Sequence, residues 1–125
     1  MKILLAEDDE VARNRLAFLL ERRGHTVVQA NDGAEGLRLL EQHRFDVILF
    51  DLVMPNVNGL EMIVQARARG SLHCPAVAVT GFGRVWTEGV EGVNATIPKP
   101  VDVGELEATI NRIVEARGRC CAERS

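Results

Sequence analysis

Short continuous apolar runs alternate with longer segments of helical periodicity along this chain. Three runs are clear, at residues 3–6, 47–50 and 76–79, and two weaker ones lie at 26–30 and 95–97. Strands that are covered on both faces have continuous apolar sequences rather than alternating ones. The pattern therefore predicts five strands that run through the interior of the molecule.

Apolar residues recur at helical spacing between these runs. Three segments carry such a stripe, 12–20, 60–64 and 103–114. The last two begin with capping-box pairs, Asn58 with Glu61 and Asp102 with Glu105, and Asp9 can cap the first. Three helices are therefore predicted with defined starting points.

Two further segments complete the order of elements. A helix is predicted over about 33–43, although Gly36 costs about 1 kcal/mol relative to alanine. Residues 81–91 contain three glycines and no clean apolar stripe, so a fourth helix there is expected to be short or irregular. Alternating strands and helices predict an α/β fold, with a doubly wound five-stranded parallel sheet and helices on both faces.

Composition and charge narrow the function classes. Of the 125 residues, 46% are hydrophobic and 26% charged, as in ordinary soluble domains, and the formal net charge is −3 without any block of Lys and Arg. Nucleic acid is therefore not an expected partner. The apolar runs are too short for a membrane span or a signal peptide, so we expect a cytoplasmic protein with no membrane partner. We expect residues 1–117 to form one domain and residues 118–125 a polar C-terminal tail.

Polar side chains stand where the predicted strands end. Glu7 and Asp8 follow the first strand, Asp51 ends the third, Thr80 ends the fourth, and Lys99 follows the fifth. The carboxyl ends of parallel strands lie at one edge of a sheet, and ligands bind there. The sequence therefore predicts that these five residues meet.

Carboxylates in one small pocket repel one another and stay ionised only if a cation is present. A cluster of at most three acidic side chains that offers only oxygen ligands suits Mg²⁺. Asp51 could then act as a nucleophile towards a phosphoryl group. The metal, Lys99 and Thr80 would neutralise the charge on the phosphoryl oxygens.

Four segments carry a resemblance to a known family. "ILLAEDD", "DLVMP…NG", "VAVTG" and "PKP" occur in the order of the signatures of the receiver domain of two-component response regulators, CheY-like, and cover nearly the whole chain. The resemblance implies a flavodoxin-like (βα)5 fold that is phosphorylated on Asp51 by a histidine kinase or a phosphotransfer protein. It also implies a signalling domain rather than an enzyme, which catalyses only its own phosphorylation and dephosphorylation and passes the signal to a downstream effector.

The same resemblance assigns individual roles. Asp8 and Asp51 would bind Mg²⁺ directly, Glu7 would act through a water molecule, and Val53 would supply a main-chain carbonyl. Thr80 would follow the phosphoryl group as the switch hydroxyl, and Lys99 would pair with it. The bond between Lys99 and Pro100 would be cis. A monomer or a phosphorylation-dependent dimer fits this family, either as a stand-alone regulator or as the N-terminal part of a longer one.

Two features depart from the family pattern. Thr80 and Lys99 are 19 residues apart, a few fewer than usual, so the fourth helix or a flanking loop is shortened. Three residues before the lysine the family tends to have an aromatic side chain, and this chain has Thr96. Phe82 or Trp86 could take over the function of that aromatic.

Two alternative functions fit the sequence less well than that of a receiver domain. An aspartyl-phosphate phosphohydrolase usually has a second acid two residues after its nucleophile, where this chain has Val53. The bulk of Val53 and Phe82 could instead restrict the attacking water and slow the loss of phosphate. A binding module for FMN would need a Ser-, Thr- and Gly-rich phosphate loop after the first strand, and acidic residues stand there.

Overall fold

The computed structural model describes residues 1–51, 58–80 and 93–124, with Thr80 and residues 117–124 described by their backbone alone. The elements follow one another in this order: β1 (Lys2–Ala6), α1 (Glu10–Glu21), β2 (Thr26–Ala30), α2 (Gly33–Gln42), β3 (Val47–Asp51), α3 (Gly59–Ala68), β4 (Ala76–Thr80), β5 (Val93–Pro98) and α4 (Val103–Arg124). The strands form one parallel sheet in the order β2-β1-β3-β4-β5. The predicted α/β fold with five parallel strands is confirmed.

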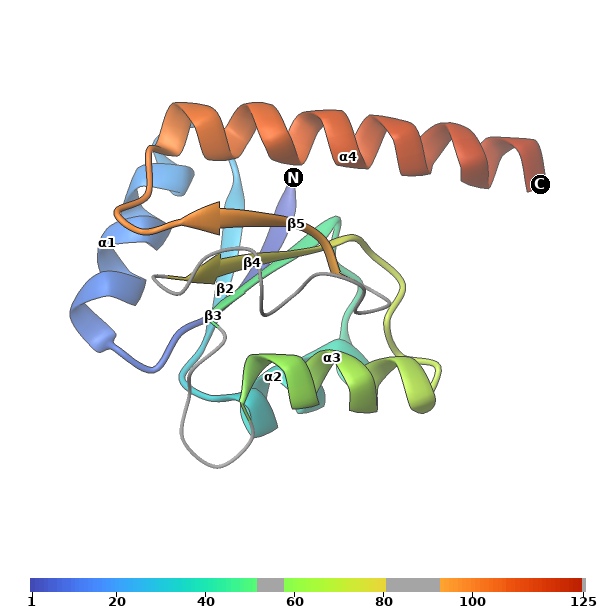
Figure 1. Ribbon diagram of the computed structural model, residues 1–125, viewed down its shortest axis with the longest axis horizontal. Coiled ribbons are helices and arrows are strands. Elements are labelled where there is room, and N and C mark those ends of the chain that lie inside the picture. Colours follow the sequence, from blue (N-terminus) through green and yellow to red (C-terminus); the bar gives the residue numbers. More distant parts are fainter. Residues whose placement is uncertain (52–57, 81–92, 125) are drawn as a thin grey trace.

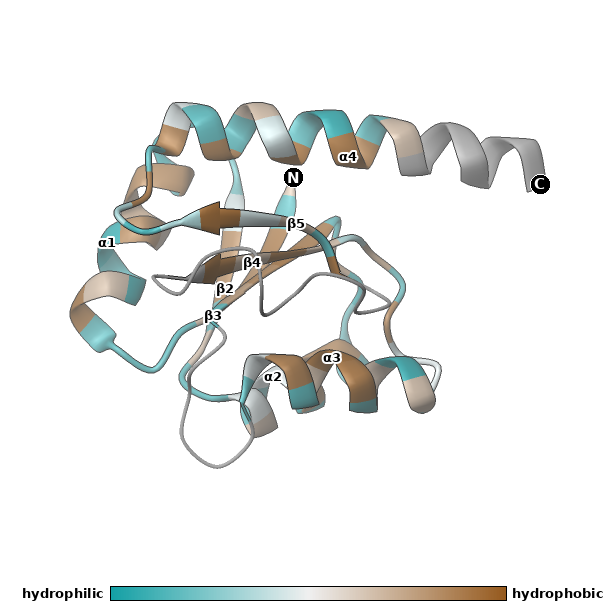
Figure 2. Cartoon of the chain, in the orientation of Figure 1, coloured by the Kyte–Doolittle hydropathy of each residue, from teal (hydrophilic) through white to brown (hydrophobic). Residues whose placement is uncertain are grey.

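The sheet lies between two layers of helices (Figure 1). Alternate residues of the strands point to opposite faces, as the geometry of a strand requires. Leu4 and Phe50 pack on the side of α2 and α3 with Leu37 and Met62, in a first buried cluster. On the other side, the same strands contribute to a second cluster with α1 and α4. Its members from these elements are Ile3, Leu5, Val47, Leu49, Ala17, Leu20, Leu106 and Ile110. In Figure 2 the central strands β3 and β4 are mostly brown, as expected for strands covered on both faces.

Side-chain caps begin the helices at the predicted residues. Asp9 accepts hydrogen bonds from the main-chain N–H groups of Val11 and Ala12 at the start of α1. Asn58 and Asp102 cap α3 and α4 in the same way. Each cap satisfies N–H groups of the first helical turn that have no partner within the helix.

The last helix is longer than the stripe at 103–114 indicates. α4 continues through residues 118–124, where the sequence predicts a polar tail, and extends past the sheet in Figure 1. The expected irregular helix at 81–91 lies outside the described residues. Among the described residues, no helix is both long and apolar enough to span a membrane.

The register of the central strands determines where the polar strand ends lie. Ala6 of β1 pairs with Phe50 of β3, so the next residues, Glu7 and Asp51, leave neighbouring strands side by side. On the other side of β3, Asp51 pairs with Val79. The carboxyl ends of β1, β3 and β4 therefore share one edge of the sheet.

Candidate functional site

Three acidic residues gather at this edge. Glu7, Asp8 and Asp51 each offer a carboxylate oxygen, and these oxygens lie within 4.8 Å of one another. Glu7 is only 6% exposed, and the side chain of Asp51 is 13% exposed, whereas Asp8 is exposed. The predicted meeting of the carboxylates is thus seen in the structure.

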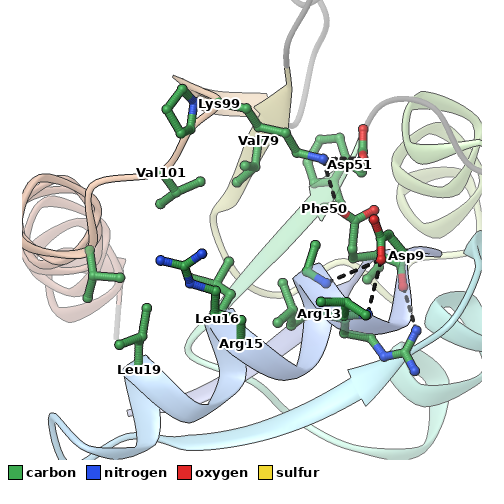
Figure 3. A pocket seen from close by; sticks show the side chains of 17 residues that line it. Asp9, Arg13, Arg15, Leu16, Leu19, Phe50, Asp51, Val79, Lys99 and Val101 are labelled. Atoms are coloured by element: carbon green, nitrogen blue, oxygen red, sulfur yellow. Dashed lines mark hydrogen bonds and ion pairs between the residues drawn. The ribbon is translucent and has the colours of Figure 1, made fainter.

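Lys99 joins the acidic cluster from the loop after β5 (Figure 3). Its Nζ atom donates to Glu7 Oε1 at 2.8 Å and to Asp51 Oδ2 at 2.7 Å. The peptide bond between Lys99 and Pro100 is cis, as expected. One ammonium group therefore bridges the ends of β1 and β3.

Burial and the ion pairs of Lys99 shift the pKa values of Glu7 and Lys99. Burial raises the pKa of Glu7 from 4.5 to about 7, and the neighbouring Asp51 acts in the same direction, while the hydrogen bond from Lys99 opposes both. Burial by itself lowers the pKa of Lys99, but the hydrogen bonds to Asp51 and Glu7 outweigh it and raise this pKa above its ordinary value of 10.5. Lys99 therefore stays charged at neutral pH.

The cluster fits a hard divalent cation. Glu7 Oε2 is buried and has no hydrogen-bond partner among the described residues. A buried carboxylate oxygen without a partner costs free energy unless a cation or a donor approaches it. Because all the candidate ligands are oxygens, Mg²⁺ is the cation that this set of residues suits best.

The remaining predicted site residues are described only in part. Thr80 is the last residue of β4, and it pairs with Pro98 of β5, so its backbone ends at the same edge. Thr96 is a half-buried residue of β5, paired with Ala78 of β4. Three further residues for which the sequence predicts a role, Val53, Phe82 and Trp86, lie outside the described residues.

Two residues beside the cluster have contacts that the sequence did not predict. Arg13 of α1 donates from Nη1 to the main-chain carbonyl of Glu7 at 2.8 Å. Gly59, the first residue of α3, lies so close to Asp51 that a Cβ atom would overlap with the Asp51 carbonyl oxygen. A glycine at the start of a helix is a weak signal of close packing, since it costs helix stability. The position of Arg13 had no comparable signal.

A cavity of about 460 Å³ runs from the acidic cluster along α1 (Figure 3). Its lining includes Leu16 and Leu19 of α1 together with Val101 and Val103. Its volume is within the range of small-molecule pockets. The acidic residues therefore stand at the end of an open, largely apolar cleft.

Comparison with known proteins gives consistent results. A family model described as the response regulator receiver domain matches residues 3–111. The CAI-1 autoinducer sensor kinase/phosphatase CqsS of Vibrio cholerae is 37% identical over 106 residues, which are 81% of this chain but 16% of CqsS. The polar-differentiation response regulator DivK of Brucella anthropi is 33% identical over 112 residues, which are 86% of this chain and 91% of DivK. This chain therefore spans a small part of one relative and nearly all of the other.

A solved structure extends the comparison to the fold. The receiver domain of the sensor histidine kinase PA1611 from Pseudomonas aeruginosa PAO1 superposes with a TM-score of 0.83 at 27% identity. The match covers 91% of this chain and 97% of that domain, which was crystallised with a magnesium ion coordinated in its active site cleft. The similarity thus extends over nearly the whole of both domains.

Proposed function

Because the chain belongs to the response regulator receiver domain family, whose model matches residues 3–111, we propose that it accepts a phosphoryl group on Asp51 and signals through the resulting change of conformation. The observation that carries the proposal is the geometry around Asp51. Its carboxylate lies within 4.8 Å of the carboxylates of Glu7 and Asp8, and 2.7 Å from the ammonium group of Lys99. A nucleophile, a set of oxygen ligands for a cation and a fixed positive charge are thus in one place.

In the proposed reaction, Asp51 is the nucleophile. One of its carboxylate oxygens attacks the phosphorus atom of a phosphohistidine, an O–P bond forms, and the P–N bond breaks. The donor imidazole leaves with the bonding electron pair. Lys99 already contacts Asp51, so its ammonium group is in place to neutralise charge on a phosphoryl oxygen during the transfer. We assign the switch hydroxyl to Thr80, which ends the neighbouring strand.

We propose Mg²⁺ as the cofactor of this site. Asp8 and Asp51 would bind it directly, Glu7 through a water molecule, and Val53 through its main-chain carbonyl. The partnerless Oε2 of Glu7 and the magnesium ion in the similar PA1611 domain support this assignment. When bound, Mg²⁺ would supply positive charge to the phosphoryl oxygens in the transition state.

We further propose a histidine kinase or a phosphotransfer protein as the donor and a downstream protein as the effector. The names of CqsS, a sensor kinase/phosphatase, and DivK, a response regulator, support both kinds of partner. In this proposal the chain is cytoplasmic, a monomer or a phosphorylation-dependent dimer, and it does not turn over phosphate esters. Residues 1–117 would form the receiver domain, and residues 118–125 a polar tail.

The test is phosphorylation by a small donor. Acetyl phosphate and Mg²⁺ should add one phosphoryl group to the protein, detected by intact-protein mass spectrometry, and EDTA should prevent the addition. Asp51→Asn should abolish the label. Asp46→Asn is the matched control, because Asp46 lies before the opposite end of the same strand, where its side chain accepts from the main-chain N–H of Lys2. A label that persists in Asp51→Asn, or an unlabelled wild type, would refute the assignment.

A further inference from the structure

Arg13 links the residues that follow β1, Glu7 and Asp8, to α1 and β2; Figure 3 shows its side chain beside the site. Its side chain leaves α1 and is half-buried. Nη1 donates to the main-chain carbonyl of Glu7 at 2.8 Å, and Nε donates to the side-chain oxygen of Gln29, in β2, at 3.0 Å. The guanidinium group is planar and presents its donors in a fixed fork. A single side chain therefore ties the end of β1 to α1 and β2.

The carbonyl that Arg13 holds belongs to the peptide between two candidate ligands. This peptide joins Glu7 to Asp8, and its atoms lie in one plane that turns as a unit. The N–H group of Glu7 is held separately, because it donates to the carbonyl of Ala30 at 3.1 Å. With both hydrogen bonds in place, neither peptide flanking Glu7 can rotate without losing a partner. The direction in which the Glu7 side chain leaves the backbone is therefore fixed, and the amide group of Asp8 is held in place with it.

We propose that Arg13 is a positioning residue of the cation site, which holds the Glu7–Asp8 peptide so that both carboxylates face the same point as Asp51. The proposal rests on the cation binding proposed above. In this role Arg13 contacts no ligand atom and no reacting atom. Its hydrogen bond to the carbonyl is charge-assisted, which makes it stronger than a bond from a neutral donor.

The charge of Arg13 and its hydrogen bond to Glu7 have opposite expected effects on the affinity for Mg²⁺. This difference makes the proposal testable. A guanidinium group near three carboxylates repels a divalent cation, so removal of its charge alone would tighten Mg²⁺ binding. Loss of the hydrogen bond to Glu7 would loosen the ligands and weaken binding. Residues that orient metal ligands typically change metal affinity by about 10- to 100-fold when they are replaced. Whether Mg²⁺ binding becomes weaker or tighter therefore shows whether Arg13 acts mainly through its hydrogen bond to Glu7 or through its charge.

The experiment measures the Mg²⁺ dissociation constant by isothermal titration calorimetry for the wild type and three variants. Arg13→Met removes the charge and both hydrogen bonds, and should weaken binding by roughly tenfold. Arg13→Lys keeps the charge but loses the fork, and should also weaken binding. Arg15→Met is the matched control, because Arg15 is an exposed residue of the same helix that lines the cavity beside the cluster. It should leave the affinity unchanged or tighten it slightly.

Two further measurements separate positioning from general stability. Urea unfolding reports whether each variant folds, and the backbone amide resonance of Asp8 reports the orientation of the peptide without Mg²⁺. That resonance should shift in Arg13→Met and Arg13→Lys and stay in place in Arg15→Met. If Arg13→Met does not fold, Arg13→Lys carries the same expectation.

The outcomes of these measurements distinguish the positioning role of Arg13 from the proposed cation site itself. Mg²⁺ binding by an Arg13 variant that is as tight as in the wild type, or tighter, overturns the positioning role and leaves the proposed function intact. Equal weakening in Arg15→Met also overturns it, because the effect then does not depend on the hydrogen bond to Glu7. A wild-type protein that binds no Mg²⁺ overturns the proposed cation site and the role of Arg13 together.

Discussion

Replacing Glu7 by glutamine should change how the stability of the metal-free protein depends on pH. Burial raises the pKa of Glu7 from 4.5 to about 7, so between these pH values the folded protein holds a proton that the unfolded chain has released. The free energy of unfolding then falls as pH rises, since the folded state binds more protons. At 1.36 kcal/mol for each pKa unit, Glu7 contributes about 3 kcal/mol below pH 4.5, and this contribution is lost by about pH 7.

The assay is urea unfolding followed by far-ultraviolet circular dichroism, in EDTA, between pH 4.5 and about 7. Glutamine has a similar volume to glutamate but does not titrate, and the carboxylates that do not interact with Glu7 cancel in the comparison. The difference in unfolding free energy between the wild type and Glu7→Gln should therefore fall by about 3 kcal/mol across this range. Saturating Mg²⁺ should reduce the fall, because the cation favours the ionised carboxylate. A difference that is constant, or that grows with pH, would show that burial does not hold Glu7 protonated.

Two other substitutions test the packing and the electrostatics nearby. Gly59→Ala should destabilise the fold by about 1–3 kcal/mol in urea and slow phosphorylation by acetyl phosphate, because a Cβ atom overlaps with the Asp51 backbone, which cannot yield. Gly36→Ala is its control, since the added Cβ overlaps only with the flexible side chain of Met62 and makes an ordinary contact with Ala6, and equal losses in both variants would contradict the reasoning. Glu107→Gln should lower stability above pH 4.5 and have no effect in strong acid, because the hydrogen bond from His25 lowers the pKa of Glu107. An effect of Glu107→Gln that increases as pH falls would contradict this.

The strands were predictable wherever both faces of a strand carry apolar residues. Residues 3–6 and 47–50 are continuous apolar runs because each faces a layer of helices on either side of the sheet. The fifth strand was one of the two weaker predictions, and β5 begins at Val93 rather than at residue 95. The polar residue Asn94 interrupts its pattern. The Asn94 side chain accepts a hydrogen bond from the N–H of Ala76, next to an irregularity in the register, so a tertiary contact explains its place in the strand.

The candidate site was predictable as a set of residues but not as a set of interactions. Parallel strands bring their carboxyl ends to one edge, which is sufficient to predict that Glu7, Asp51 and Lys99 meet. The raised pKa of Glu7 depends on its burial in the folded protein, which no local pattern encodes. The contact of Arg13 with the Glu7 carbonyl likewise depends on how α1 packs against the sheet. The local sequence therefore indicates which residues form the site, and tertiary packing determines their pKa values and their hydrogen bonds.

The alternation of side chains along the central strands divides the interior into two compartments that share only main-chain atoms. Leu4 and Phe50 belong to one compartment, and Ile3 and Leu49 to the other. A change in residue volume beneath α2 and α3 therefore has no direct contact with the side chains beneath α1 and α4. Each pair of helices can therefore be repacked against its own face of the sheet without altering the side chains on the other face. The ladder bonds of β1 and β3 meanwhile keep the acidic edge in place.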